Sequence, residues 1–126
     1  MDSGEVAKLS EIERYEYLIQ NTINHKEIWL LQDNDSSFAM FEDEKGNSYI
    51  PVWTEKTLAQ AQAIDDWASY SAGRMSLNEF MEWLDELKED QILIGALPDI
   101  NMHALSVDPI EFKKLLIKTM KGKTNY

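Results

Sequence analysis

A chain of 126 residues with 44% hydrophobic and 10% aromatic residues can bury one core, which excludes a chain that is disordered throughout. Because it has no cysteine, it can form no disulfide bond, thiolate nucleophile or cysteine metal site, which suits the reducing cytosol. Its early charges and short apolar runs predict a cytoplasmic protein without a signal peptide or membrane span. We expect a single domain over residues 1–126, with flexible ends at 1–8 and 122–126.

The net charge of −11 is unevenly distributed along the chain. Residues 113–126 carry five lysines and no acid, whereas residues 1–112 carry 12 − 5 = 7 basic and 23 acidic residues, a charge of −16. An acidic body of this kind repels nucleic acid and anionic lipid, so we expect neither as a partner. The acids either keep the protein soluble or form a docking face for a basic partner protein, and the lysines are typical of a solvated helix end.

Three helices begin with recognisable signals. Ser10 and Glu13 form a capping-box pattern, and apolar residues at helical spacing predict a helix that runs to about Asn24. A second such pattern over residues 76–79 opens a helix with one apolar face and one acidic face. Residues 108–111 supply an N-cap aspartate, a proline at the first helical position and an early acid, and predict the last helix.

Five strands are expected. Residues 28–31, 38–41 and 49–53 read as a three-stranded meander joined by polar turns. The first of these is apolar on both faces, as in an internal strand, whereas Pro51 cannot donate to a ladder, so the third strand should be an edge or end there. A later pair of strands is expected at 92–94 and 103–107.

Between the meander and the second capping pattern lies a fourth expected helix. Thr54 is its predicted N-cap and Ile64 its last residue, with Leu58, Ala61 and Ile64 facing inward. An irregular connector should follow, carrying Trp67, Tyr70 and Gly73. The order of elements predicts an α+β fold, a mainly antiparallel sheet of about five strands packed with about four helices.

The first polar turn invites comparison with a calcium-binding loop. Acidic and polar residues at 33–37 are followed by Glu44 at the twelfth position of such a loop. A calcium loop needs a glycine at its sixth position for the sharp turn, and Phe38 stands there. A hairpin turn is therefore the favoured interpretation.

The remaining ionisable residues suggest no catalytic site, cofactor or metal site. Asp65 and Asp66 are neighbours at a predicted helix end, and neighbouring side chains on a helix diverge by about 100°. His25 falls in a turn and His103 at the start of a strand, so neither belongs to a pair with metal-ligand spacing. The common catalytic and phosphate-binding motifs are absent from the sequence. We therefore assign no catalytic, cofactor-binding or metal-binding residue.

The four tryptophans divide into two groups. Trp29 is predicted to be core, and Trp83 to be core or core edge, because it lies one position from the apolar stripe of its helix. Trp53 and Trp67 flank a helix of small residues and either close the sheet edge or line a groove together with Tyr70. Aromatic side chains in such a groove bind peptides and small apolar ligands well.

Several of these features recur in the same order in one family. Residues from about Arg14 to Leu116 resemble the small bacterial domain-of-unknown-function family numbered 2750, on Trp29, Pro51-Val52-Trp53, Trp67, Leu77-Asn78-Glu79-Phe80 and Val107-Asp108-Pro109 with Glu111. The chain departs from the family at Ser36-Ser37, where the family tends to place a glycine, so a different first turn is expected. The resemblance implies no activity and no catalytic residues. A more distant similarity in layout to SseB-type secretion-associated domains implies protein binding only by analogy.

We therefore expect a small acidic protein that binds another protein without catalysis, such as an inhibitor or immunity-type protein for a basic partner. The residues expected to carry binding are Trp53, Trp67, Tyr70, Glu79, Glu82, Glu86 and Glu89. One alternative is a hydrolase-like enzyme with scattered Asp, Glu and His residues near Trp67. Another is a structural subunit of an oligomer. The sequence leaves the oligomeric state open.

Overall fold

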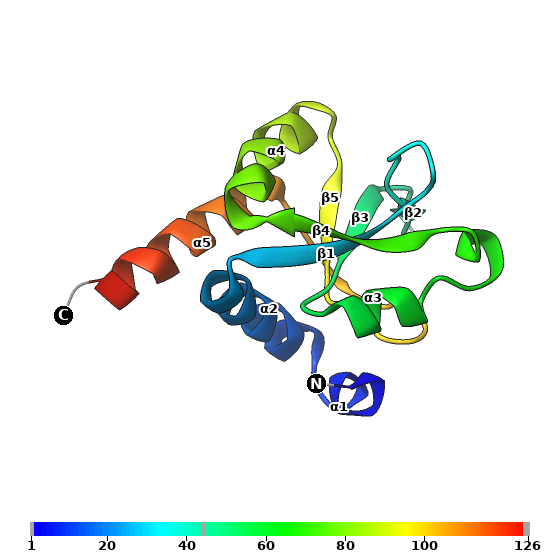
Figure 1. The fold of residues 1–126 in the computed structure, drawn as a ribbon. Coiled ribbons are helices and arrows are strands. Elements are labelled where there is room, and N and C mark those ends of the chain that lie inside the picture. Colours follow the sequence, from blue (N-terminus) through cyan, green and yellow to red (C-terminus); the bar gives the residue numbers. More distant parts are fainter. Residues whose placement is uncertain (1, 44, 125–126) are drawn as a thin grey trace.

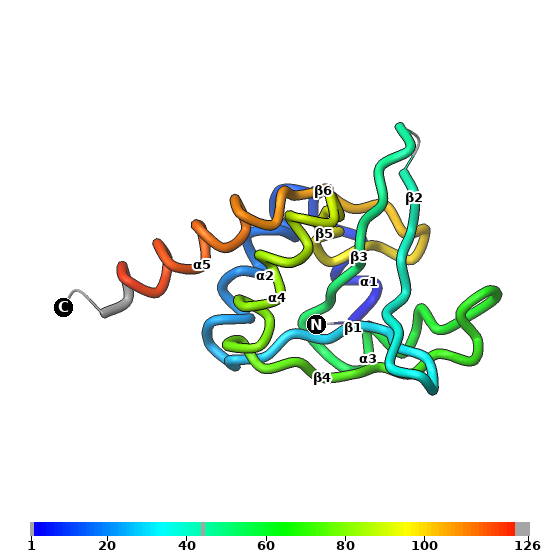
Figure 2. Tube along the Cα trace, turned by 90° about the horizontal axis from the view of Figure 1, so that it is seen from above, coloured from blue at the N-terminus to red at the C-terminus, as the bar shows by residue number. Residues whose placement is uncertain are grey.

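A computed structural model describes residues 2–43 and 45–124, and it has the α+β class that the sequence predicts (Figure 1). The elements are α1 (Ser3–Ala7), α2 (Glu11–His25), β1 (Glu27–Gln32), β2 (Phe41–Glu42), β3 (Ser48–Val52), α3 (Lys56–Ala61), the 3₁₀ helix η1 (Asp65–Trp67), β4 (Ser71–Ser76), α4 (Leu77–Glu89), β5 (Leu93–Ala96), β6 (Leu105–Val107) and α5 (Pro109–Thr124). The described chain forms a two-stranded sheet of order β1-β4 and a four-stranded sheet of order β2-β3-β5-β6. Helices α2, α4 and α5 gather at one end of the strands, and α5 extends away from the body (Figure 2).

The three expected helix starts are confirmed. Ser10 Oγ accepts the Glu13 N–H and Glu13 accepts the Ser10 N–H, so both bonds of the capping box are present. Ser76 caps α4 by accepting the Glu79 N–H, but its hydroxyl also donates to the Glu79 carboxylate in place of the second capping-box bond. Asp108 accepts the backbone N–H groups of the first turn of α5.

Three hairpin loops share one construction, each built on an aspartate. The carboxylates of Asp33, Asp43 and Asp99 each accept the backbone N–H groups two and four residues later, at 2.9 Å. The fourth residue of each loop has positive φ: Ser36, Gly46 and Met102. The hairpin interpretation of residues 33–37 is thus confirmed, because the Asp33 carboxylate is engaged in closing the turn. Glu44 lies outside the described residues.

The predicted meander is confirmed only in its second hairpin, where β2 pairs with β3. β1 pairs with β4, which lies in the segment expected to be an irregular connector, from Glu27↔Ser76 to Gln32↔Ser71. The expected second strand is reduced to β2, and Phe38 contributes only an isolated bridge to Gln32. Residues 71–76 show no alternation of apolar and polar side chains, and all six side chains are exposed or partly exposed. Their strand conformation therefore depends on pairing with β1 rather than on a local sequence pattern.

The third strand is internal rather than an edge, and it ends at Val52, one residue after Pro51, close to the other expectation. β3 pairs with β2 on one side and with β5, in parallel, on the other. Pairing with β2 stops at Tyr49, and the Trp53 N–H donates to Trp29 on that same side. Because alternate residues of a strand direct their N–H groups to the same side, the nitrogen of Pro51 lies in the gap between these two pairings. Proline is tolerated there because no acceptor stands opposite it.

The helix predicted from Thr54 to Ile64 is shorter than expected. α3 begins at Lys56 with Glu55 at the N-cap position, and Thr54 is a buried residue of the bend that follows β3. Leu58 is buried as predicted, but Ala61 is exposed and Ile64 is 53% exposed. The chain returns to an extended conformation at Ile64, so the apolar stripe does not continue.

The ends of the chain complete the description. Residues 3–7 form α1, in which Val6 is buried, and Asp2 supplies a capping box. Residues 125–126 of the expected flexible C-terminal end lie outside the described residues, and flexibility of both ends stays a prediction.

Gly95 is the glycine with the least room for an added side chain. A Cβ atom added to it would lie 2.6 Å from Cε2 of Tyr49, in the buried β3–β5 pair. We expect Gly95→Ala to lower the free energy of unfolding by about 2 kcal/mol, because the Tyr49 ring has to leave its place. Urea denaturation monitored by circular dichroism measures this change.

Gly73→Ala is the matched control in β4. The added Cβ would lie 2.6 Å from Oε1 of Gln32, the far end of a flexible side chain that can move aside. Its effect should stay within about 0.5 kcal/mol. Equal losses in both variants would contradict the proposed role of the Tyr49 contact.

Candidate functional site

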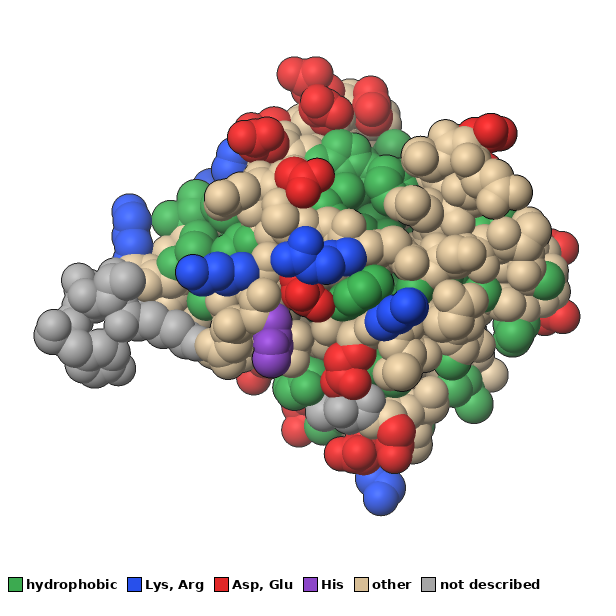
Figure 3. Space-filling view, in the orientation of Figure 1, with side chains coloured by type: hydrophobic (Ala, Val, Ile, Leu, Met, Phe, Trp, Pro, Cys, Tyr) green, Lys and Arg blue, Asp and Glu red, His purple; other side chains and the backbone are tan. Residues whose placement is uncertain are grey.

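The predicted acidic residues lie together on one helix. Glu79, Glu82, Glu86 and Glu89 are all exposed on α4, while the opposite side of that helix buries Leu77, Phe80, Leu84 and Leu87. The amphipathic spacing of the helix produces this division. Figure 3 shows acidic side chains gathered over α4, at the top of the molecule in that view.

An apolar group lies directly beside these acids. The rings of Phe38 and Trp83 are 4.8 Å apart and tilted, and Met40, two residues beyond Phe38 in an extended segment, is 46% exposed. Both aromatic side chains are half-buried against the core. Hydrophobic side chains between α4 and the loop after β1 are visible in the space-filling view (Figure 3). We call Phe38, Trp83, Glu82, Glu86 and Glu89 the α4 surface.

The other predicted binding residues lie elsewhere. Trp67 packs on Phe41, with Tyr70 edge-on at 6.5 Å. Trp67 also lines a hollow of about 250 Å³ together with two highly exposed isoleucines, Ile64 and Ile100. η1 precedes β4 and α4 follows it, so a six-residue strand of about 20 Å separates this hollow from the acids of α4. Figures 1 and 2 both show the two regions at opposite ends of β4.

Trp53, predicted to close the sheet edge or line a groove, lies in the core, whereas Trp29, predicted to be core, is partly exposed. Trp53 is 1% exposed and belongs to the core, so a groove cannot use its ring in this conformation. Trp29 is only half-buried, and its indole N–H donates to Glu27 Oε2 at 2.7 Å. The alternation of β1 explains this result, because Ile28 and Leu30 occupy the core face on either side of Trp29.

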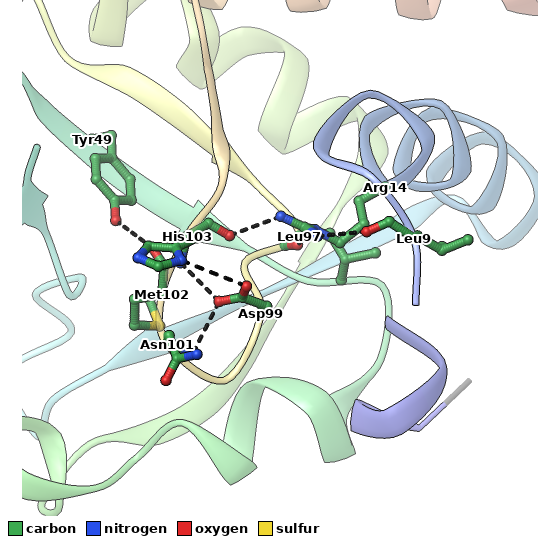
Figure 4. A network of polar contacts seen from close by, with 8 residues as sticks. All are labelled: Leu9, Arg14, Tyr49, Leu97, Asp99, Asn101, Met102 and His103. Carbon is green, nitrogen blue, oxygen red and sulfur yellow. Dashed lines mark hydrogen bonds and ion pairs between the residues drawn. The ribbon is translucent and has the colours of Figure 1, made fainter. Parts of the chain in front are cut away.

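His103 and Asp99 are the histidine and carboxylate whose arrangement comes nearest to a catalytic pair (Figure 4). His103 Nδ1 is 3.8 Å from Asp99 Oδ2, longer than a hydrogen bond, and its side chain is 74% exposed. The other Asp99 oxygen closes the loop by accepting backbone N–H groups. His103 lines a groove of about 770 Å³ with Tyr49 and Ser106, whereas Asp65 lines the Trp67 hollow on the other side of the 99–103 loop. The structure therefore does not bring Asp65 and His103 into one pocket.

Tyr49 is a structural part of that groove. Its hydroxyl donates to the Met102 carbonyl at 3.0 Å, which ties β3 to the loop. Burial, with Asp43 and Asp99 nearby, raises the pKa of Tyr49, so the phenol stays neutral and can donate at physiological pH.

Arg14 holds the same loop from inside, and the sequence interpretation missed it. The residue is 4% exposed, and its guanidinium donates to the carbonyls of Leu97, Leu9 and His103, each at 2.9 Å (Figure 4). The available signal was its position one helical turn before Leu18, on the buried face of α2. Arg14 thus fixes the wall of the groove to the start of α2.

The described part of the chain contains neither a metal-binding group of side chains nor a membrane-spanning helix. No group of three or more His, Asp or Glu side chains is placed to hold a metal ion among residues 2–43 and 45–124. Within the same residues, no helix has the length and apolar character needed to cross a membrane.

Comparison with known proteins gives one match. A family described as "Protein of unknown function (DUF2750)" matches residues 15–116, from α2 to the middle of α5. No curated protein and no solved structure matches the chain. The matched residues include the α4 surface, the Trp67 hollow and all of the His103 groove except Glu11.

Arg14→Met should destabilise the protein by about 2 to 3 kcal/mol, because it removes three hydrogen bonds to backbone carbonyls, of which only that of His103 keeps another donor, the Asp99 N–H. Thermal or urea unfolding measures the loss. Arg74→Met is the control, since Arg74 is 53% exposed and pairs only at the surface with Glu27, and it should cost at most about 1 kcal/mol. A loss for Arg14→Met no larger than that of the control would contradict the buried clamp.

Proposed function

The chain belongs to the DUF2750 family, whose function is unknown, and we propose a function from the structure. The protein is a non-catalytic module that binds a basic partner protein through the α4 surface. The surface combines exposed carboxylates with a half-buried aromatic pair. Interfaces commonly have this composition, an aromatic centre with a polar rim. An inhibitor that covers the basic cleft of its target is one form that such a module takes.

The observation that carries the proposal is the placement of acids where helix physics disfavours them. Glu82 and Glu86, Asp85 and Glu89, and Glu86 and Asp90 are like-charged pairs four residues apart, which destabilise a helix. Glu86 and Glu89 also stand near the C-terminus of α4, the negative pole of its macrodipole. A basic partner would relieve both repulsions, so the free protein tolerates a local cost that binding removes.

Most of these acids have no cation of their own. Asp85 pairs with Lys113 of α5 at 2.9 Å. For Glu82, Glu86 and Glu89 no ion pair is found within the described residues. Their carboxylates are exposed and available to lysine or arginine side chains of a partner. Such contacts steer association and weaken as salt screens them.

Phe38 and Trp83 supply the anchor that the sequence interpretation sought at Trp53 or Trp67. Trp83 lies next to Glu82 and one turn before Glu86, so a partner that reaches these acids also meets its ring. Phe38 and Phe80 hold Trp83 at ring distances of 4.8 and 6.4 Å. A tryptophan fixed in this way loses little side-chain entropy on binding.

Reversal of two charges tests the proposed binding. We expect the protein with Glu86→Lys and Glu89→Lys to lose capture of a basic protein from native lysate, and the wild-type capture to weaken between about 50 and 200 mM salt. Trp83→Ala should lose the same protein. The control is Glu16→Lys with Asp66→Lys, which makes an equal charge change at exposed positions away from α4. If this control loses the same protein equally, or the α4 variant keeps it, the proposal is wrong.

The same variant makes a second prediction, which needs no partner. Lysines at 86 and 89 convert all three repulsive pairs of α4 into attractive ones and place cations at the helix C-terminus. The free energy of unfolding should therefore rise by about 1 to 2 kcal/mol at low salt. Urea denaturation at low and high salt measures the change, and unchanged or reduced stability at low salt would contradict the argument from helix repulsion.

A further inference from the structure

A groove of about 490 Å³ lies between β6, α5 and the first turns of α2. Its apolar lining comes from all three elements, through Tyr15, Leu105, Val107 and Leu115. Val107 is buried in the core and the other three are half-buried against it. A groove of this volume has room for an aromatic side chain of another molecule.

Two lysines of α5 also line the groove. Lys114 and Lys118 are exposed and lie one helical turn apart on the same side of α5. For Lys118 no ion pair is found within residues 2–43 and 45–124. Lys114 is 3.8 Å from Glu111, and because these side chains are 70% and 68% exposed, the pair is weak and can exchange for another carboxylate. The acid at the other end, Asp108, is already engaged by Lys88 and by the first turn of α5.

The α4 surface carries the complementary pattern. Glu82 and Glu86 are exposed and one helical turn apart, the same spacing as that of the two lysines. Trp83 follows Glu82 directly, so a contact that pairs these carboxylates with the lysines brings an aromatic ring to the apolar lining. An aromatic centre between charged pairs is a common form of protein interface.

A single molecule cannot bring these two surfaces together. α4 and α5 pack side by side, with the rings of Phe80 and Phe112 5.5 Å apart and Lys113 bound to Asp85 at 2.9 Å (Figures 1 and 2). Lys114 comes directly after Lys113, so its side chain diverges by about 100° from the one that reaches α4. The groove lies on that other side of α5, toward β6 and α2. The contact therefore requires a second molecule.

We propose that this groove binds the α4 surface of a second copy of the chain. The Trp83 ring lies on the apolar lining, and the carboxylates of Glu82 and Glu86 pair with the two lysines. This inference rests on the proposed binding through the α4 surface and names one partner for it. A foreign basic protein and a second copy of the chain then compete for the same carboxylates.

The purified protein tests the contact by sedimentation velocity. It should self-associate between about 20 and 500 µM at about 50 mM salt, with a Kd at least about 10-fold weaker at about 500 mM salt. Dilution of ¹⁵N-labelled protein should move the indole N–H signal of Trp83, assigned by Trp83→Phe, and leave that of Trp67, at the other end of β4, in place. A monomer at the highest concentration and low salt, or equal movement of both signals, would overturn the inference.

Reversed charges test the pairing itself. Lys114→Glu with Lys118→Glu, the groove variant, should be monomeric, and so should Glu82→Lys with Glu86→Lys, because like charges then face each other. An equimolar mixture of the two variants should associate again, since each surface of one finds the opposite charge on the other. Misfolded variants could not regain association in this way. A mixture that stays monomeric would sink the proposed pairing.

The matched control is Lys8→Glu with Lys56→Glu. It makes the same charge change as the groove variant at exposed positions outside the groove, so it should keep self-association. As complete a loss in this control as in the groove variant would show that total charge, rather than the groove, governs association, and would contradict the inference.

Capture from native lysate separates this inference from the proposed function. The groove variant keeps its α4 surface, so it should capture a basic protein at least as well as the wild type, because no second copy competes. A wild type that is monomeric but captures a basic protein through α4 overturns this inference alone. Self-association without any such capture overturns the foreign partner and leaves the contact between copies standing.

Discussion

Two backbone hydrogen bonds between Trp29 and Trp53 organise the molecule. The N–H of each residue donates to the carbonyl of the other, at 2.9 and 2.8 Å, and this bridge joins the β1–β4 sheet to the four-stranded sheet. As directly opposed residues of antiparallel strands, Trp29 and Trp53 direct their side chains to the same face of this pairing, where Trp53 is 1% exposed and Trp29 is half-buried beside Glu27. The bridge also fixes the point at which the chain leaves β3 for α3. The register between the two sheets therefore follows from one pair of contacts.

Local signals in the sequence were enough for the starts of three helices and for the class of fold. Ser10, Ser76 and Asp108 act within four residues of the backbone groups they cap, so their effect can be read without knowledge of the rest of the chain. The same holds for the turn at Asp33, which closes on its own residues. Membership of the family was likewise visible, because the order of its aromatic and proline residues is a property of the sequence.

Pairing of strands was not predictable in the same way. β4 has no apolar alternation of its own and is a strand because β1 lies beside it, while the place of Pro51 depends on where β2 stops. Arg14 was missed for a related reason: its three acceptors lie up to 89 residues away, so its burial has no local trace beyond its place on the helix. The candidate binding residues divided accordingly, with the acids kept together by one helix and the aromatic residues separated by pairings that only the fold reveals.

The parallel β3–β5 pair has a consequence for how the chain folds. Tyr49 meets Leu93 and Val52 meets Ala96, so more than forty residues, including α3, β4 and α4, lie between the partners. The aspartate loops can close early because their contacts are local, whereas this pair has to pay the closure entropy of a long segment. During synthesis, β3 is complete well before β5 leaves the ribosome, and its apolar residues Ile50 and Val52 await their partner. The centre of the larger sheet is thus expected to be the last part to assemble and the part most exposed to misassembly.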